Sequence, residues 1–420
     1  MAERIAAEQV GRISAEFKRQ GVTVEYERTA DGVVYLYAAD QLLVREQDVA
    51  DVSGVLEPLV SFEMDSADPI DGIKIVRFGP NGPYARRPTV REVLKRIEAA
   101  EISENAVAPN YVLTVAPETG PCPATEPEEV YFEIEPTPGV RMDDRSNGSG
   151  VRIYIADTGL LADAESHWWL KMVRGEPDPL EPLPGELIKP YAGHGTFVAG
   201  VARCMARDAG VYVSDAFNVA GSALESDFVK DLDSALSFGV NIFNLSVTTR
   251  AKGKLRLLGF EQWLTVLRDQ HPDVVCVVAA GNDSSSQKFW PAAYAVDDPE
   301  QVISVGALAA DWRSRASFTN HGPWVQVYAP GRDLVNAYAT GTYQCQDAPY
   351  TGQLREFYGM AKWSGTSFST PIVTGLIAAR MSREGVTARE AAASLLEDAR
   401  EQAIPGVGPI LLPYDNGFDI

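Results

Sequence analysis

The sequence has few of the residues that bind metals or cross-link chains. Its 420 residues include only four cysteines and four histidines. The cysteines, Cys122, Cys204, Cys276 and Cys345, lie far apart and form no CxxC pair, so we expect no zinc site and reduced thiols. Cys276 stands inside an apolar stretch, which predicts a buried free thiol.

Long hydrophobic runs are also missing. The longest, Val274 to Ala280, suits a buried strand, whereas a membrane span needs roughly 18 or more apolar residues. Near the start, charges alternate with apolar residues such as Ile5, Val10, Ile13 and Phe17, which predicts an amphipathic helix rather than a secretory signal. We therefore expect a cytoplasmic protein with no membrane partner, and we leave open secretion by a non-standard route.

Positive charge is scarce relative to negative charge. The chain has 37 Lys and Arg against 58 Asp and Glu, a net charge of -21, and it shows no basic patch. Nucleic acid is therefore not an expected partner, and the acidity itself favours solubility. No acidic cluster has the spacing of a calcium loop. We expect no cofactor and leave calcium open.

Composition breaks divide the chain into four segments. We predict an N-terminal α+β domain over 1–116, a proline-rich linker over 117–145, a larger domain over 146–405 and a tail over 406–420. Strand patterns alternate with helix patterns in the larger domain, which indicates an α/β fold with a mainly parallel sheet flanked by helices. Functional sites in such sheets form at the carboxyl ends of the strands.

Four polar residues stand where that rule places a site. Asp157 follows the strand predicted over Val151 to Ala156, and Asn282 follows the apolar run that ends at Ala280. His194 and Ser367 each open a predicted helix. Each motif alone has an ordinary reading as a turn, a cap or a loop, but their joint appearance favours one site.

The residue types suit nucleophilic catalysis. A serine hydroxyl needs an adjacent base, and histidine titrates near neutral pH. A carboxylate on the far ring nitrogen fixes the tautomer of the base. A side-chain amide and a backbone N–H can together hold an oxyanion. Ser367, His194, Asp157 and Asn282 are therefore the candidate nucleophile, base, orienting acid and oxyanion donor.

With these motifs the sequence resembles the subtilisin-like (subtilase) serine peptidases. The resemblance implies a seven-stranded, mainly parallel α/β fold and hydrolysis of peptide bonds through an acyl-enzyme on Ser367. It also implies substrates that are proteins or peptides, and a backbone N–H of Ser367 beside Asn282 in the oxyanion hole. It rests on the segments Ile155 to Gly159, Gly193 to Gly200, Ala279 to Asn282, Ala316 to Gly322, Tyr328 to Gly331 and Gly365 to Pro371.

The resemblance extends to the expected substrate-binding residues. These are Ser246, Val247, Thr248, Ala279, Ala280 and Gly281. The family pattern Ser-x-Gly-Gly is replaced here by Ser246-Val247-Thr248-Thr249. Glycines there let a substrate backbone approach closely, so we expect Thr248 to narrow the S1 side of the substrate-binding cleft. Residues Thr342 to Lys362 resemble an insertion that could shape the cleft just before the serine motif.

The N-terminal domain is similar to a subtilase propeptide. Its predicted element order suits a small β-α-β-β-α-β fold, and Ala106 to Leu113 resembles the last strand of such a propeptide. The resemblance implies that the domain inhibits its own active site and that self-cleavage falls near Tyr111 to Thr125. An unrelated accessory domain is the alternative.

Two other functions stay open. A catalytically silent binding protein could keep the protease fold, although the complete motifs favour an enzyme. A dedicated processing protease with one partner substrate would fit a narrowed cleft.

Overall fold

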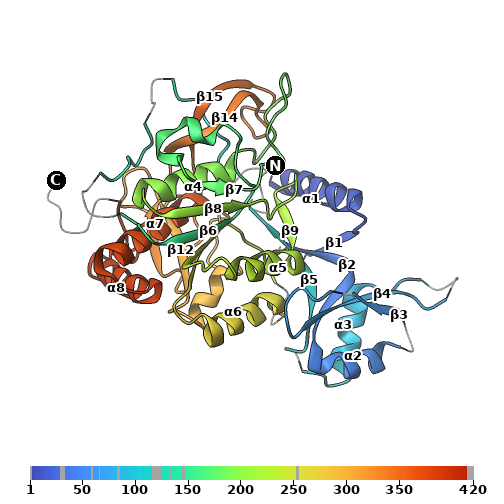
Figure 1. The fold of residues 1–420 in the computed structure, drawn as a ribbon. Coiled ribbons are helices and arrows are strands. Elements are labelled where there is room, and N and C mark those ends of the chain that lie inside the picture. The colour runs from blue at the N-terminus through green and yellow to red at the C-terminus, as the bar shows by residue number, and fades with distance from the viewer. Residues whose placement is uncertain are drawn as a thin grey trace.

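The computed structural model describes residues 2–28, 34–57, 60–65, 67–82, 86–103, 105–115, 124–131, 135–142, 147–251 and 255–413. They form a large parallel sheet between two layers of helices, an antiparallel sheet beside it and a separate hairpin (Figure 1). Within these residues no helix is long and apolar enough to cross a membrane, and no three His, Cys, Asp or Glu side chains gather to hold a metal ion. Cys122 lies outside them, and the other three cysteines are buried free thiols.

The large sheet has seven strands in the order β13-β12-β11-β10-β6-β8-β7, and each pair is parallel. Every residue of its central strands is buried, as expected for a sheet covered on both faces. This confirms the predicted fold class. The strands are β6 (Arg152–Ala156), β7 (Arg174–Gly175), β8 (Gly210–Ser214), β10 (Ile242–Leu245), β11 (Val275–Ala279), β12 (Val302–Leu308) and β13 (Val327–Pro330).

Helices cover both faces of this sheet (Figure 1). α4 (His194–Met205) packs against α7 (Thr366–Glu384), and α8 (Ala388–Glu401) packs on α7. α5 (Glu225–Leu236) and α6 (Leu258–Gln270) pack together on the opposite face. Short 3-10 helices are η1 (Glu46–Asp48), η2 (Ala164–Ser166), η3 (Trp168–Leu170) and η4 (Ala292–Val296).

The N-terminal residues form an α+β unit with the predicted order of elements. Helix α1 (Ala2–Arg19) and strand β1 (Val24–Arg28) come first, and six elements in the order β-α-β-β-α-β follow. They are β2 (Val34–Arg45), α2 (Val49–Leu56), β3 (Val60–Met64), β4 (Ile73–Pro80), α3 (Val90–Ala99) and β5 (Val107–Thr114).

Two further strand pairs complete the fold. β5 pairs antiparallel with β9 (Ser222–Leu224), so the N-terminal sheet continues into the larger domain. β14 (Leu334–Gln344) and β15 (Leu354–Trp363) form a hairpin, which contains the residues predicted to be an insertion. β15 ends at Trp363, four residues before Ser367.

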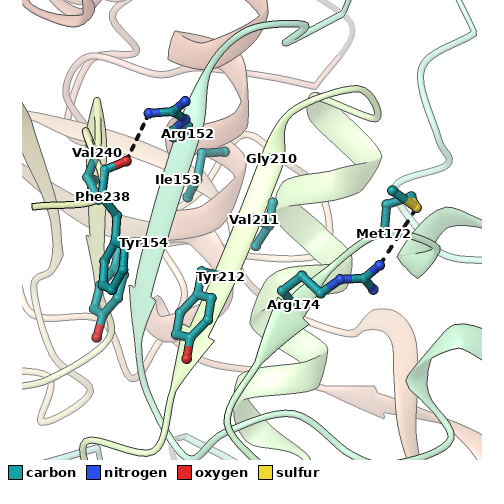
Figure 2. Close-up of a pocket in the computed structure, with 10 residues that line it drawn as sticks. All are labelled: Arg152, Ile153, Tyr154, Met172, Arg174, Gly210, Val211, Tyr212, Phe238 and Val240. Carbon is teal, nitrogen blue, oxygen red and sulfur yellow. Dashed lines mark hydrogen bonds between the residues drawn. The ribbon is translucent and has the colours of Figure 1, made fainter.

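A hollow is lined by residues of β6 and β8 and by residues that follow α5 (Figure 2). Tyr154 and Tyr212 stack across it with ring centroids 5.7 Å apart. Arg152, at the amino end of β6, donates a 2.9 Å hydrogen bond to the carbonyl of Phe238. Because Asp157 follows the carboxyl end of the same strand, this hollow is separate from the candidate catalytic residues.

Asn110 of β5 ties the N-terminal unit to helix α5. Its side chain is fully buried, and its Oδ1 accepts a 3.1 Å hydrogen bond from the backbone N–H of Ser226 in the first turn of α5. Its Nδ2 donates to Ser226 Oγ at 2.9 Å and to Gln41 Oε1 at 2.8 Å. Asn110 thus satisfies a helix N–H that has no intrahelical partner.

Replacing Asn110 with Ala is expected to lower the free energy of unfolding by about 1–3 kcal/mol, because it leaves a buried N–H without a partner. Urea denaturation of the full chain, in a Ser367→Ala background, would measure this. Asn105→Ala, at an exposed position of the same segment, is the control and should change little. Equal effects of the two substitutions would contradict the capping role.

A buried carboxyl links α5 to α6. Glu225 is fully buried, and its Oε1 accepts hydrogen bonds from the backbone N–H groups of Gly259 at 2.6 Å and Phe260 at 3.2 Å. Burial raises its pKa to about 8, and these two hydrogen bonds offset part of the rise. The folded protein therefore holds a proton here that the unfolded chain releases above its ordinary carboxyl pKa.

This sign predicts that Glu225 makes the protein less stable as the pH rises from about 5 to about 8, because the unfolded state binds fewer protons. Glu225→Gln keeps the accepting oxygen and cannot ionise, so its unfolding free energy should fall less over that window, by a few kcal/mol at most. Urea unfolding at both pH values tests this, with the exposed Asp273→Asn as control. Identical pH slopes for wild type and Glu225→Gln would contradict it.

Candidate active site

Asp157 and His194 meet at the carboxyl edge of the large sheet. Asp157 is the first residue after β6, and His194 is the first residue of α4. The His194 Nδ1 and Asp157 Oδ1 atoms lie 2.7 Å apart, and both side chains are fully buried. The backbone N–H of Thr158 also donates to Asp157 Oδ1 at 2.9 Å. The carboxylate therefore favours a proton on Nδ1 and leaves Nε2 as the basic nitrogen.

The ring of His194 is held among aromatic side chains. The rings of Trp363 and Phe368 have centroids 5.5 Å and 5.3 Å from it. Its Nε2 is buried and has no hydrogen-bond partner among the described residues. No hydrogen bond from Ser367 Oγ reaches it, and such contacts often tighten only when substrate binds.

Ser367 lies in the first turn of α7, in agreement with the helix expected to open at the serine motif. Pro371 is therefore inside the helix and cannot donate to the carbonyl of Ser367, four residues before it. That carbonyl instead accepts a 3.2 Å hydrogen bond from Ser246 Oγ. Because Pro371 leaves the Ser367 carbonyl free, Ser246 can bind that carbonyl and hold the turn that carries Ser367.

Asn282 follows β11 and points its amide toward the same turn. Its Oδ1 accepts from the backbone N–H of Thr366 at 2.8 Å and from Thr366 Oγ1 at 3.0 Å. Because the oxygen is engaged, the amide nitrogen of this half-buried side chain presents its two N–H donors on the other side. Gly281 before it has φ +100, and a Cβ there would lie 2.5 Å from Asn320 Nδ2.

Comparison with known proteins shows the family to which the chain belongs. The model of the subtilase family matches residues 148–408, more than half of the chain. The chain belongs to the subtilase family. It is 30% identical over 278 residues to a thermophilic serine proteinase of Bacillus sp. (strain AK1), covering 59% of this chain and 57% of that protein. It is 29% identical over 255 residues to Subtilisin DY of Bacillus licheniformis, covering 56% and 78%.

One solved structure resembles most of the subtilase described here. Fervidolysin from Fervidobacterium pennivorans, a keratinolytic enzyme related to subtilisin, aligns with a TM-score of 0.58 and 18% identity. The alignment covers 90% of this chain and 60% of that one, so the shared fold includes part of the N-terminal unit. The chain spans little more than half the length of the first curated relatives it matches, at 57% each.

The predicted substrate-binding residues of this subtilase fall into two groups. Thr248 exchanges backbone hydrogen bonds of 2.8 Å and 2.9 Å with Thr114 of the N-terminal unit. Val247 and Ala280 instead pack in the hydrophobic core, and Ala279 is the buried last residue of β11. Among the six residues predicted, Thr248 is thus in backbone contact with the N-terminal strand, Ser246 contacts Ser367, and Gly281 donates to Thr366 Oγ1 at 3.2 Å.

Residues 112–115 lie in a groove between β9 and Thr248. Val112, Leu113 and Thr114 pair with Leu224, Ala223 and Ser222 of β9, and the N–H of Val115 donates to the carbonyl of Gly221 at 3.1 Å. On the other side, Thr249 Oγ1 donates to the carbonyl of Val112 at 2.8 Å. The groove therefore binds an extended segment by backbone pairing on both sides.

Three residues of the site were not predicted. Thr249 and the strand β9 bind the segment in the groove, and Trp363 packs edge-on against His194. Asp178 accepts hydrogen bonds from the N–H groups of Gly193 and Leu180, both at 2.7 Å, and so holds the turn before His194. Burial raises the pKa of Asp178 to about 7. Of these residues, Trp363 alone has a recognisable signal in the sequence, because it is an aromatic residue just before the serine motif.

Replacing Asn282 with Ala is expected to lower kcat by about two to three orders of magnitude with little change in KM, the loss known when such a donor is removed from a subtilisin. Peptide hydrolysis by the variant measures this. Ser286→Ala, exposed in the same loop, serves as control. A loss confined to KM would contradict an oxyanion role, because it would show equal binding of ground and transition states.

Proposed function

We propose that this subtilase is a serine endopeptidase that acts on proteins or peptides. The observation that carries the proposal is the buried 2.7 Å contact between His194 Nδ1 and Asp157 Oδ1, which leaves Nε2 as a base beside the helix turn of Ser367. The motif order and the orientation of Asn282 support the same reaction. The alternatives of a silent binding protein and of a dedicated processing protease are outcomes of the tests below.

Each step of the reaction has a group to perform it. Ser367 Oγ attacks the scissile carbonyl while His194 Nε2 takes its proton, and Asp157 stabilises the resulting imidazolium. Asn282 Nδ2 and the N–H of Ser367 hold the oxyanion. The imidazolium then gives the proton to the leaving amine. In the second half of the reaction, His194 takes a proton from water, which attacks the acyl-enzyme, and returns the proton to Ser367 Oγ.

The N-terminal unit would act as an intramolecular inhibitor. Residues 112–115 fill the groove and run antiparallel to residues around Thr248, toward Ser246 and so toward Ser367. A segment in this position stands where the acyl side of a substrate would lie. The nearly complete burial of Ser367, 2% exposed, agrees with a closed site. The predicted cleavage region, Tyr111 to Thr125, includes residues 116–123, which lie outside the described part of the chain.

The proposal predicts that wild type shortens itself by a fragment ending within 116–123 and then hydrolyses an unfolded protein substrate, whereas Ser367→Ala does neither. Intact mass measured over time, together with a protein-digestion assay, tests both. Ser317→Ala, exposed on the surface, should behave as wild type.

If wild type digests protein but stays full length, the proposed self-processing is excluded and the proposed peptidase activity stands. A folded wild type that does neither would favour the silent binding protein. Cleavage of a broad panel of peptides would exclude a dedicated processing protease.

A further inference from the structure

Residues 124–128, named here the strap, run along the end of β15 beside the serine motif. The N–H of Ala124 donates to the carbonyl of Ser364 at 3.2 Å, and Trp363 Nε1 donates to the carbonyl of Thr125 at 2.7 Å. Glu128 and Lys362 exchange backbone hydrogen bonds of 2.8 Å and 2.9 Å as an antiparallel pair. The strap is thus joined to β15 by one antiparallel bridge, at Glu128, and by two hydrogen bonds near Ser364.

Side chains hold the strap as firmly as the backbone does. Glu126 is 6% exposed, and its Oε1 accepts from Tyr343 Oη at 2.8 Å and from the N–H of Gln346. Arg355 Nη1 donates to the carbonyl of Pro127 at 2.6 Å. Lys362 Nζ lies 2.7 Å from the Glu128 carboxylate. Every residue of the strap therefore makes at least one polar contact with the hairpin or with Ser364.

The strap and the N-terminal strand contact different residues near the nucleophile. Residues 112–115 approach Ser367 past Thr248 and Ser246, which is the acyl side of the groove. The strap contacts Trp363 and Ser364, and the Trp363 ring stands at 88° to the ring of His194 with centroids 5.5 Å apart. Because His194 gives the proton to the leaving amine, the strap held by Trp363 lies near the part of the site where the leaving group departs.

The two bound segments are held by separate sets of contacts. Residues 116–123 connect them, whereas Ser364 is only three residues from Ser367, a separation of at most ~10 Å even for an extended chain. An extended substrate would cover that distance with about three residues. The eight connecting residues therefore exceed the number that this distance requires, so that cleavage among them need not displace the strap.

We infer that the strap stays bound after the linker is cut and fills the leaving-group side of the cleft. This subtilase then cleaves substrates with a short leaving group, such as small amides or peptide bonds one or two residues from a carboxyl end, faster than internal bonds of a protein chain. The selection rests on the proposed function, whereas the persistence of the strap rests on the strap contacts alone.

The first test does not need activity. An enterokinase site is inserted after Gly120 in the Ser367→Ala chain, the linker is cut, and hydrogen exchange of the segment around Lys362 is followed by mass spectrometry. We expect exchange there to stay as slow as before the cut. Glu126→Ala should speed it roughly tenfold or more by removing a buried anchor, whereas the exposed Glu135→Ala should not. Fast exchange after the cut alone would overturn the inference.

The second test uses processed wild type and peptides that share their acyl side but carry one or four residues after the scissile bond. We expect kcat/KM to be roughly tenfold or more higher for the short leaving group, and Glu126→Ala to reduce that ratio. A wild-type ratio near one would overturn the leaving-group selection. If no peptide is cleaved, the proposed function fails, and the exchange measurement still decides whether the strap persists.

Discussion

The hydrogen bond between His194 Nδ1 and Asp157 Oδ1 is the interaction that the sheet and the helices around it must position. A buried carboxylate is costly unless hydrogen bonds stabilise it, and here the N–H of Thr158 and the imidazole supply them. The parallel sheet brings the carboxyl end of β6 beside the start of α4, and Asp178 fixes the turn of Gly193 between them. The sheet thus acts as the rigid support of one pair of side chains.

The same backbone pairing that would bind a substrate binds this chain's own residues on both sides of the nucleophile. Thr114 pairs with Thr248 on the acyl side, and Glu128 pairs with Lys362 on the other. Because both segments are tethered to the fold, they would compete with a free substrate at a high effective concentration if the proposed inhibition holds. The two segments differ in what holds them: the first belongs to the N-terminal sheet, and the second belongs to the hairpin before Ser367.

Much of this arrangement could be predicted from the sequence, because it depends on local patterns. Continuous apolar runs predict the buried strands, and the motifs at Asp157, His194, Asn282 and Ser367 stand at strand ends and helix starts. The contacts of Thr249, Asp178 and the strap could not be predicted, because they join residues far apart in the chain through backbone groups that every residue type has.

We propose that Ser367 is an activated nucleophile that the chain's own segments close off. The most direct measurement is the rate at which a fluorophosphonate modifies Ser367, compared between the full chain and the chain from which the N-terminal unit has been cut and removed. The account predicts slow modification of the full chain and much faster modification after removal, with both rates lost in Asp157→Asn. Equal rates before and after removal, or no modification of the folded protein in either form, would contradict it.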